Sequence, residues 1–227
     1  MSQLNVTTLK HESAGVDNIT LASNGFVGIG TSNPQQMLEV STGSSNNGVR
    51  IRRYPTGAYY SDIVHTTAPE GLAFKIGDGS TVTERMRIDS AGRVTMPYQP
   101  AFETGFSAAV SLSDGSVCVF NWVGFNRGGH YSNSTGRFTA PITGVYQFQY
   151  SNNIQRLTGS WTGFHFAVNG TSVHVCYADG LTSWMNMSMS VLLYLQAGDY
   201  VNIVSRGSGN MQHDSKDYGT FTGQLIG

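Results

Sequence analysis

The chain has 227 residues, of which only 12% are charged, so it has room for one large domain or two small ones with a surface of short polar side chains. Its formal net charge is −1 and no run of Lys and Arg is longer than Arg52-Arg53, which argues against nucleic acid as a partner. No stretch has the ~18 uncharged apolar residues of a membrane span, and residues 1–5 lack the pattern of a signal peptide, so we expect neither membrane insertion nor export by the usual secretion route.

Residues 1–96 are predicted to form short β-strands separated by Gly, Asn, Asp and Ser turns. Residues 19–27 and 86–94 share the order strand, Ser-x-Gly turn, strand, and both read as hairpins. Residues 33–39 offer a possible helical turn with Pro34 early in it. The apolar content is too low for the core of a single chain, so we expect several copies to share one core in an extended, β-rich trimeric stalk.

A linker is predicted at residues 97–100, because Pro97 and Pro100 cannot join a central strand. Beyond it lie most of the phenylalanines and all three tryptophans, which provide enough large apolar surface for a globular head at residues 101–227. The segments of the head that read as strands are 144–150, 164–168, 171–175, 190–195, 200–204 and 220–226.

The strongest short hairpin signal is Asn169-Gly170. A two-residue turn there would pair Phe166 with Val173 on one face of the hairpin and His165 with His174 on the other. Near a three-fold axis such histidine pairs could chelate a metal, which makes His165 and His174 the only metal candidates. A polar cross-strand pair is the alternative interpretation.

The head resembles the C1q/tumour-necrosis-factor family. The lead-in Gly-Arg-Phe-Thr-Ala-Pro at 136–141 and the closing Phe221-x-Gly223-x-Leu225 are similar to that family. Eight positions, one of them in the lead-in, lie at the spacings of the C1q-domain signature: Phe120, Asn126, Tyr131, Phe138, Gly144, Tyr146, Phe148 and Tyr150. The resemblance implies a ten-stranded jelly-roll β-sandwich that assembles as a homotrimer, with these residues in the core and the trimer contacts rather than in a binding site.

Residues 18–34 and 86–97 resemble repeated modules in tail-fibre proteins of marine tailed phages such as cyanophages. That resemblance implies a particle-docking segment at 1–20, bound to other tail or capsid proteins of the virion, and a fibre stalk at 21–96. Animal C1q proteins instead carry a collagen-like Gly-x-y stalk, which this sequence lacks. The expected location is therefore the virion, with assembly in the host cytoplasm and release by lysis.

A ligand is expected at the end of the head away from the stalk. Successive connections of an antiparallel jelly roll fall at alternate ends, and the longer ones, 151–161, 177–185 and 206–218, share one end. Their aromatic surfaces and bidentate polar groups suit a glycan of the host envelope, or a host protein. The candidate residues are Arg156, Trp161, Tyr177, Asp179, Trp184, Arg206, His213, Asp214, Lys216, Asp217 and Tyr218. The alternative is that the tryptophans plug the sandwich ends and the others are solvated loop residues.

We expect no enzymatic activity and no cofactor. Polysaccharide hydrolysis would need a carboxylate pair about 5 to 9 Å apart, and the long β-helix common in such fibre enzymes has no counterpart here. The carboxylates of the head are Glu103, Asp114, Asp179, Asp199, Asp214 and Asp217. The two cysteines, Cys118 and Cys176, are expected to be unpaired buried thiols.

Three functions remain open at this point. The first is a tail fibre whose head recognises a host receptor. The second is a structural virion component, such as a capsid spike, head fibre or tail connector, without direct receptor binding. The third is a cellular C1q-like adhesion or signalling ligand, which would require a secretion signal.

Overall fold

The computed structural model describes residues 7–9, 19–41, 48–52, 59–179 and 183–227, and all regular structure in them is β. The prediction of an all-β chain is thereby confirmed. The chain divides into two compact units, Met1–Pro97 and Tyr98–Gly227. Most of the predicted docking segment at 1–20 lies outside the described residues. None of the described residues form a helix long and apolar enough to span a membrane.

The first sheet of the N-terminal unit has four strands, β1 (Thr8–Leu9), β2 (Ile19–Leu21), β3 (Val27–Ile29) and β4 (Leu38–Val40). The hairpin predicted at 19–27 is confirmed, because β2 and β3 pair antiparallel with Leu21 opposite Val27. The helical turn predicted at 33–39 is wrong. Leu38 lies in β4, which pairs parallel to β3, and the Met37 carbonyl accepts a hydrogen bond from the Val27 amide at 2.9 Å. Strand pairing thus uses a backbone group that a helical turn would have needed.

The second sheet of this unit runs in the order β5 (Gly48–Arg52), β6 (Tyr60–Thr67), β7 (Glu70–Gly77), β8 (Val82–Asp89) and β9 (Val94–Thr95). The second predicted hairpin is confirmed by the antiparallel pairing of β8 with β9, which places Ile88 opposite Val94. Both hairpins could be read from the sequence because a glycine with positive φ closes each turn, Gly25 in the first and Gly92 in the second.

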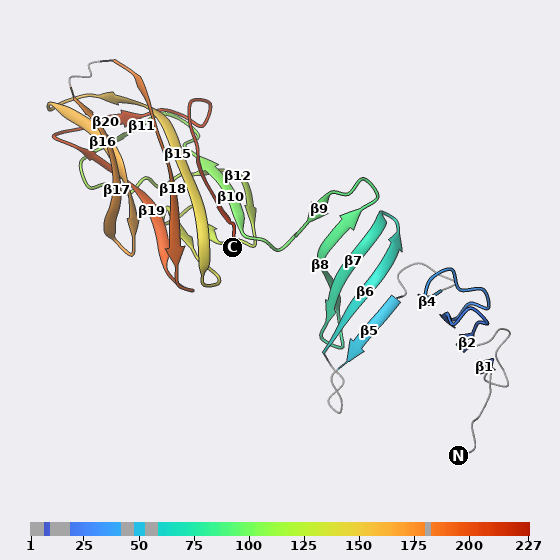
Figure 1. Cartoon of the computed structure of the whole chain (residues 1–227). Coiled ribbons are helices and arrows are strands. Elements are labelled where there is room, and N and C mark those ends of the chain that lie inside the picture. The colour runs from blue at the N-terminus through green and yellow to red at the C-terminus, as the bar shows by residue number, and fades with distance from the viewer. Residues whose placement is uncertain (1–6, 10–18, 42–47, 53–58, 180–182) are drawn as a thin grey trace. The chain divides into compact units, whose positions relative to one another are not determined.

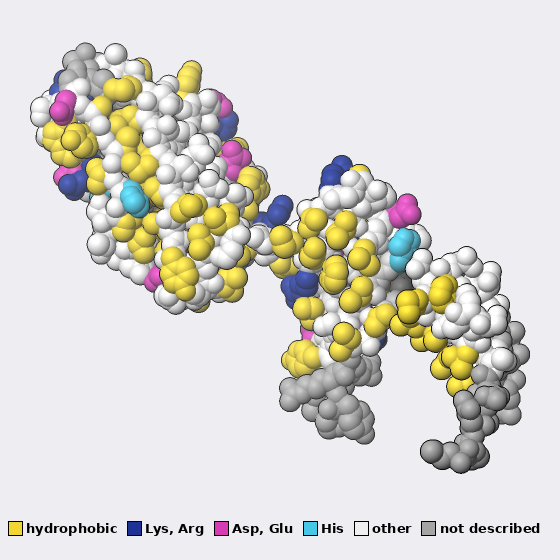
Figure 2. Space-filling view, in the orientation of Figure 1, with side chains coloured by type: hydrophobic (Ala, Val, Ile, Leu, Met, Phe, Trp, Pro, Cys, Tyr) yellow, Lys and Arg dark blue, Asp and Glu magenta, His cyan; other side chains and the backbone are white. Residues whose placement is uncertain are grey.

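The two faces of this β5–β9 sheet differ sharply. One face carries the ion pairs Arg50–Asp62, at 2.7 Å, and Arg87–Glu84. The other face is apolar, because cross-strand partners share a face and the register aligns hydrophobic residues across the strands. Its exposed members are Val49, Ile51, Ile63, Leu72, Ile76 and Val94, with exposed fractions of 39% to 64%. Figure 2 shows hydrophobic side chains gathered over this sheet. Among the described residues before Pro97, the buried hydrophobic residues are Val64, Ala73 and Pro34.

The C-terminal unit, the head, is a sandwich of two antiparallel sheets (Figure 1). The large head sheet has seven strands: β10 (Ala101–Gly105), β11 (Val110–Leu112), β12 (Trp122–Arg127), β15 (Gly144–Arg156), β18 (Met185–Leu195), β20 (Met211–His213) and β21 (Phe221–Leu225). The small head sheet has five strands, in the order β13 (Tyr131–Ser132), β14 (Arg137–Thr139), β19 (Tyr200–Gly207), β16 (Trp161–Val168) and β17 (Thr171–Asp179). The predicted jelly-roll sandwich is confirmed, with β11 and β20 widening the large sheet beyond the ten strands expected.

Aromatic side chains fill the space between the two head sheets. All six aromatic residues of the signature, Phe120, Tyr131, Phe138, Tyr146, Phe148 and Tyr150, are buried there. Phe102 stacks on Tyr131 and Phe138 with ring centroids 5.2 and 5.1 Å apart. Gly223 has to be glycine, because a Cβ at that position would lie 2.5 Å from ring atoms of both Phe102 and Phe148. The core is therefore closely packed and intolerant of added volume.

The two remaining signature residues act on the backbone. Asn126 holds the turn before β13, because its side-chain amide donates to the Tyr131 carbonyl at 2.8 Å and its Oδ1 accepts from the Tyr131 amide at 3.1 Å. Gly144 begins β15 beside the chain end, where a Cβ would lie 2.8 Å from the carbonyl oxygen of Gly227. Both residues are thus explained by local structure.

The Asn169-Gly170 turn joins β16 to β17 with φ values of 51° and 81°, as a two-residue hairpin turn requires. The strand pairing predicted beyond it is wrong. The register shifts between Phe166 and Ala167, so His174 lies opposite Phe166 and His165 lies opposite Val175. The shift is a β-bulge, in which β17 has one extra residue, and this residue moves His174 along the strand and away from His165. The two histidines therefore do not form a cross-strand pair.

Both cysteines are free, as expected. Cys118 is buried in the core and Cys176 is half-buried on β17. Burial raises the pKa of both thiols, so neither forms a reactive thiolate at neutral pH.

Candidate functional site

The small head sheet carries a depression on the face turned away from the core. Phe164 and Phe166 of β16 point into the core, so Trp161, Gly163 and His165, which alternate with them, point outward. The depression is lined by Trp161, His165, Ser172, Val175, Tyr177, Asp179 and Arg206, from β16, β17 and β19. We refer to these seven residues as the β16–β17 depression.

The hollow exists because Gly163 stands at its centre. Gly163 pairs with Tyr177 on one side and with Arg206 on the other, and it contributes no side chain between them. A Cβ there would lie 2.1 Å from the carbonyl oxygen of Cys176, so β17 approaches too closely for any other residue. The resulting volume is about 410 Å³, within the range of about 300 to 1,000 Å³ that is typical of small-molecule sites.

Two aromatic rings form one corner of the depression. The rings of Trp161 and Tyr177 meet nearly at right angles, with centroids 6.0 Å apart and an interplanar angle of 74°. Tyr177 is 64% exposed, so most of its ring is open to a ligand. Asp179 lies opposite Trp161 in the strand register and places a carboxylate beside this corner.

The opposite side of the depression is polar. The Arg206 guanidinium lies 3.5 Å from the Asp114 carboxylate, which also accepts a hydrogen bond from the Gly207 amide at 3.2 Å. His165 is only 7% exposed, and its Nδ1 has no hydrogen-bond partner among the described residues. Burial lowers the pKa of His165, the Arg206 charge lowers it further, and Asp114 opposes the shift. The imidazole is therefore neutral at pH 7, and its unpartnered Nδ1 is closed off from solvent.

Four of the residues proposed from the sequence come together here: Trp161, Tyr177, Asp179 and Arg206. The prediction that they lie in connecting loops is wrong, because all four lie in strands β16, β17 and β19. Sequence reasoning missed His165 as a neighbour of this group. The signal was present, since residues 161, 163 and 165 alternate along one face of a strand.

The other proposed residues lie outside the depression. Trp184, Asp217 and Tyr218 are exposed, while Arg156, Asp214 and Lys216 are half-buried. His213 is fully buried: its Nδ1 is 2.9 Å from the Tyr150 hydroxyl and its Nε2 is 3.0 Å from the Ser205 hydroxyl. The assignment of His213 to a ligand site is therefore wrong, because both its nitrogens are used inside the core.

The candidate histidines do not form a metal centre in this structure. No group of three or more His, Cys, Asp or Glu side chains within the described residues could hold a metal ion. The register shift after Phe166 also removes the geometry on which the His165–His174 candidate depended.

Comparison with known proteins identifies the head. The family model of the C1q domain matches residues 101–226, which is more than half of the chain. This chain belongs to the C1q domain family. Proteins of the C1q/TNF group are generally non-enzymatic signalling or structural proteins, in agreement with the expectation from the sequence.

The curated relatives that match part of this chain include two mammalian proteins. The chain is 33% identical over 134 residues to the complement C1q tumor necrosis factor-related protein 6 of Rattus norvegicus and 31% identical over 134 residues to that of Mus musculus. Each match covers 57% of this chain and 50% of the relative, so the chain spans about half the length of the curated relatives it matches.

Solved structures are similar to part of this chain. The match to the globular domain of zebrafish complement 1qA protein covers 57% of this chain and 98% of that structure, with 18% identity and a TM-score of 0.47. The match to Eiger TNF from S. frugiperda covers 56% of this chain and 91% of that structure, with 12% identity and a TM-score of 0.45.

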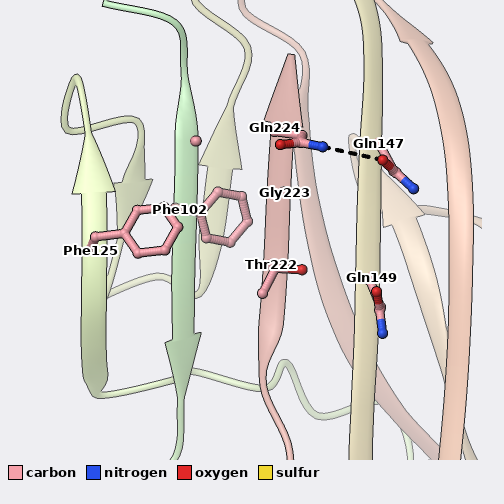
Figure 3. Close-up of a pocket in the computed structure, with 8 residues that line it drawn as sticks. Phe102, Phe125, Gln147, Gln149, Thr222, Gly223 and Gln224 are labelled. Atoms are coloured by element: carbon pink, nitrogen blue, oxygen red, sulfur yellow. Dashed lines mark hydrogen bonds between the residues drawn. The ribbon is translucent and has the colours of Figure 1, made fainter. Parts of the chain in front are cut away.

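C1q/TNF domains form homotrimers, and this C1q domain has an exposed apolar face on its large head sheet. Leu192 and Tyr194 of β18 point away from the core and are 62% and 67% exposed, and Phe125 of β12 is 48% exposed. Between them, glutamines line a shallow hollow (Figure 3), in which the Gln224 amide donates to Gln147 Oε1 at 3.3 Å. We call Phe125, Gln147, Leu192, Tyr194 and Gln224 the open face.

Proposed function

We propose that this chain is a homotrimeric fibre protein of a tailed-phage virion, whose three C1q heads bind a glycan or protein on the host surface. Residues 1–20 attach the fibre to tail or capsid proteins of the particle. Assembly takes place in the host cytoplasm and lysis releases the product. The activity is binding without catalysis.

The main observation in favour of a trimer is the exposed apolar face of the β5–β9 sheet. Six of its hydrophobic residues are at least 39% exposed, and the buried hydrophobic residues of the same unit, among those described, are Val64, Ala73 and Pro34. Leaving that much apolar surface in water is unfavourable by roughly 25 cal/mol per Å², and contiguous exposed patches of this kind mark interfaces. Two further copies of the same sheet supply a matching surface, and the homotrimers of C1q/TNF domains supply the symmetry.

The open face of the head supports the same assembly. Leu192, Tyr194 and Phe125 are large apolar groups on a sheet whose opposite side already fills the core. Aromatic residues at the centre of a patch with polar groups between them are typical of protein interfaces. In the trimer this face packs against a neighbouring head, which leaves the small head sheet and its depression turned outward.

The assignment to a phage rests on the N-terminal unit. Its β-hairpins at 19–27 and 86–94 resemble phage fibre modules, and the C1q family match begins only after them, at residue 101. A structural virion component without receptor binding is the alternative within the same particle. A second candidate, a cellular C1q-type ligand, is favoured by the names of the rat and mouse relatives.

Labelling of particles tests the assignment. Antibody fragments raised against residues 101–227 are added to purified phage from a lysate in which the chain is produced, and electron microscopy locates them. We expect label at the tips of tail fibres, and we expect the purified full chain to compete with the phage for adsorption to host cells. Label on the capsid without competition supports the structural alternative, and absence of the chain from washed particles supports the cellular ligand.

A further inference from the structure

We propose that the β16–β17 depression binds a neutral pyranose, with the sugar ring in the corner of Trp161 and Tyr177 and its hydroxyls on Asp179 and Arg206. This proposal rests on the proposed function, because it names the ligand class and the residues of the recognition surface. It also moves the site from the loops at the end of the head to the outward face of the small head sheet.

The aromatic corner selects a ring with an apolar face. Trp161 and Tyr177 stand at 74° to one another, so a flat ligand that stacks on one ring meets the edge of the other. The C–H face of a pyranose offers the apolar surface that stacks on an aromatic ring. Val175, 49% exposed at the floor of the depression, adds apolar contact beneath the ring.

The polar groups that a ligand can reach lie beside the aromatic corner. His165 is more than nine-tenths buried, and its Nδ1, which has no partner among the described residues, is closed off from solvent. The His165 imidazole therefore contributes a neutral wall to the depression. The Asp179 carboxylate and the Arg206 guanidinium are the charged groups of the lining.

The charges select against anions. The depression contains one cation, Arg206, and one carboxylate, Asp179, while a second carboxylate, Asp114, lies 3.5 Å from Arg206. Arg206 is thus already partly compensated, and an added carboxylate or phosphate would face two like charges. Neutral hydroxyls fit, because they donate to Asp179 and accept from Arg206.

The test is direct binding of defined sugars to the assembled full chain. Methyl α-glycosides of glucose, galactose and mannose are titrated by saturation-transfer NMR and calorimetry, with N-acetylneuraminic acid as the anionic probe. We expect at least one neutral glycoside to bind with a Kd of about 1 mM, and we expect the anionic sugar not to bind. Tyr177→Ala and Trp161→Ala should each weaken binding at least about tenfold.

Matched control variants distinguish the loss of contacts to the sugar from a general destabilisation of the head. Tyr218→Ala and Trp184→Ala remove exposed aromatic residues of the same kinds that lie outside the depression, and both should bind like the wild type. Binding of no neutral glycoside, or equal affinities of the Tyr177→Ala and Tyr218→Ala variants, would overturn the proposal.

The glycan site and the function as a host-binding fibre are refuted by different results. If the Tyr177→Ala chain still competes for phage adsorption as well as the wild type, the head is a receptor-binding head but the depression is not its glycan site. If the wild type binds a glycoside through Tyr177 yet never competes for adsorption, the site stands and the function as a host-binding fibre falls.

Discussion

The buried histidine His213 should make the head acid-sensitive in a defined pH window. Its nitrogens contact only the hydroxyls of Tyr150 and Ser205, and burial lowers its pKa to about 4. In the unfolded chain a histidine has a pKa of about 6.5. Between these two values the unfolded state binds a proton that the folded state does not, so stability falls as the pH falls from about 6.5 to about 4 and then levels off.

The size of the effect follows from the pKa difference. Roughly two and a half pKa units at 1.36 kcal/mol each amount to about 3 kcal/mol from this one side chain. His165 shifts in the same direction, and carboxylates also titrate at low pH, so the wild type alone cannot isolate His213. The His213→Gln variant can, because glutamine keeps hydrogen-bonding capacity and does not titrate.

Urea unfolding of both proteins, followed by tryptophan fluorescence at one fixed protein concentration, measures the effect. We expect the stability advantage of the wild type over His213→Gln to shrink by about 3 kcal/mol between pH 7 and pH 4. His174→Gln, which removes an exposed imidazole, is the matched control. If the advantage over His213→Gln changed by less than about 1 kcal/mol across this range, the argument from burial would be refuted.

Three further substitutions probe assembly and packing. Leu192→Asp places a charge on the open face and should convert the trimer to monomers in sedimentation velocity, whereas Leu157→Asp, at an exposed leucine outside that face, should leave the trimer intact. Ile76→Lys, on the apolar face of the β5–β9 sheet, should lower the melting temperature of the N-terminal unit and increase its proteolysis in the full-length trimer, and an unchanged melting curve and digestion pattern would contradict the shared core. Gly223→Ala forces a methyl group to within 2.5 Å of two phenylalanine rings and should reduce the unfolding free energy of the head by about 1 to 3 kcal/mol in denaturant titrations; full stability would mean that the rings can move apart.

The parts of the fold that follow local patterns could be predicted. Strict alternation identified β15 through its inward Tyr146, Phe148 and Tyr150, and the Asn169-Gly170 dipeptide identified the β16–β17 turn. The predicted end of β15 was too early, because the strand continues to Arg156. Its inward position there is Asn152, a polar residue satisfied by the Asp214 backbone at 2.7 and 3.2 Å, and a hydrophobic pattern cannot reveal such a partner.

The candidate site shows the same division between local and long-range information. Trp161 and Tyr177 were identified by their chemistry, but the depression depends on Gly163 and on a strand register that includes a bulge. A bulge leaves little trace in composition, and one residue of shift changes every cross-strand neighbour. His213 was misassigned for a related reason, since its partner Tyr150 is 63 positions away in sequence.

The unpaired state of Cys118 and Cys176 sets the chemical conditions under which the head can fold. Because its rigidity comes from interlocked aromatic rings and not from a disulfide, no oxidase or isomerase is needed to complete it. Such a domain can fold under reducing conditions, and the buried Cys118 thiol is shielded from oxidants. Melting curves recorded with and without dithiothreitol should therefore superimpose.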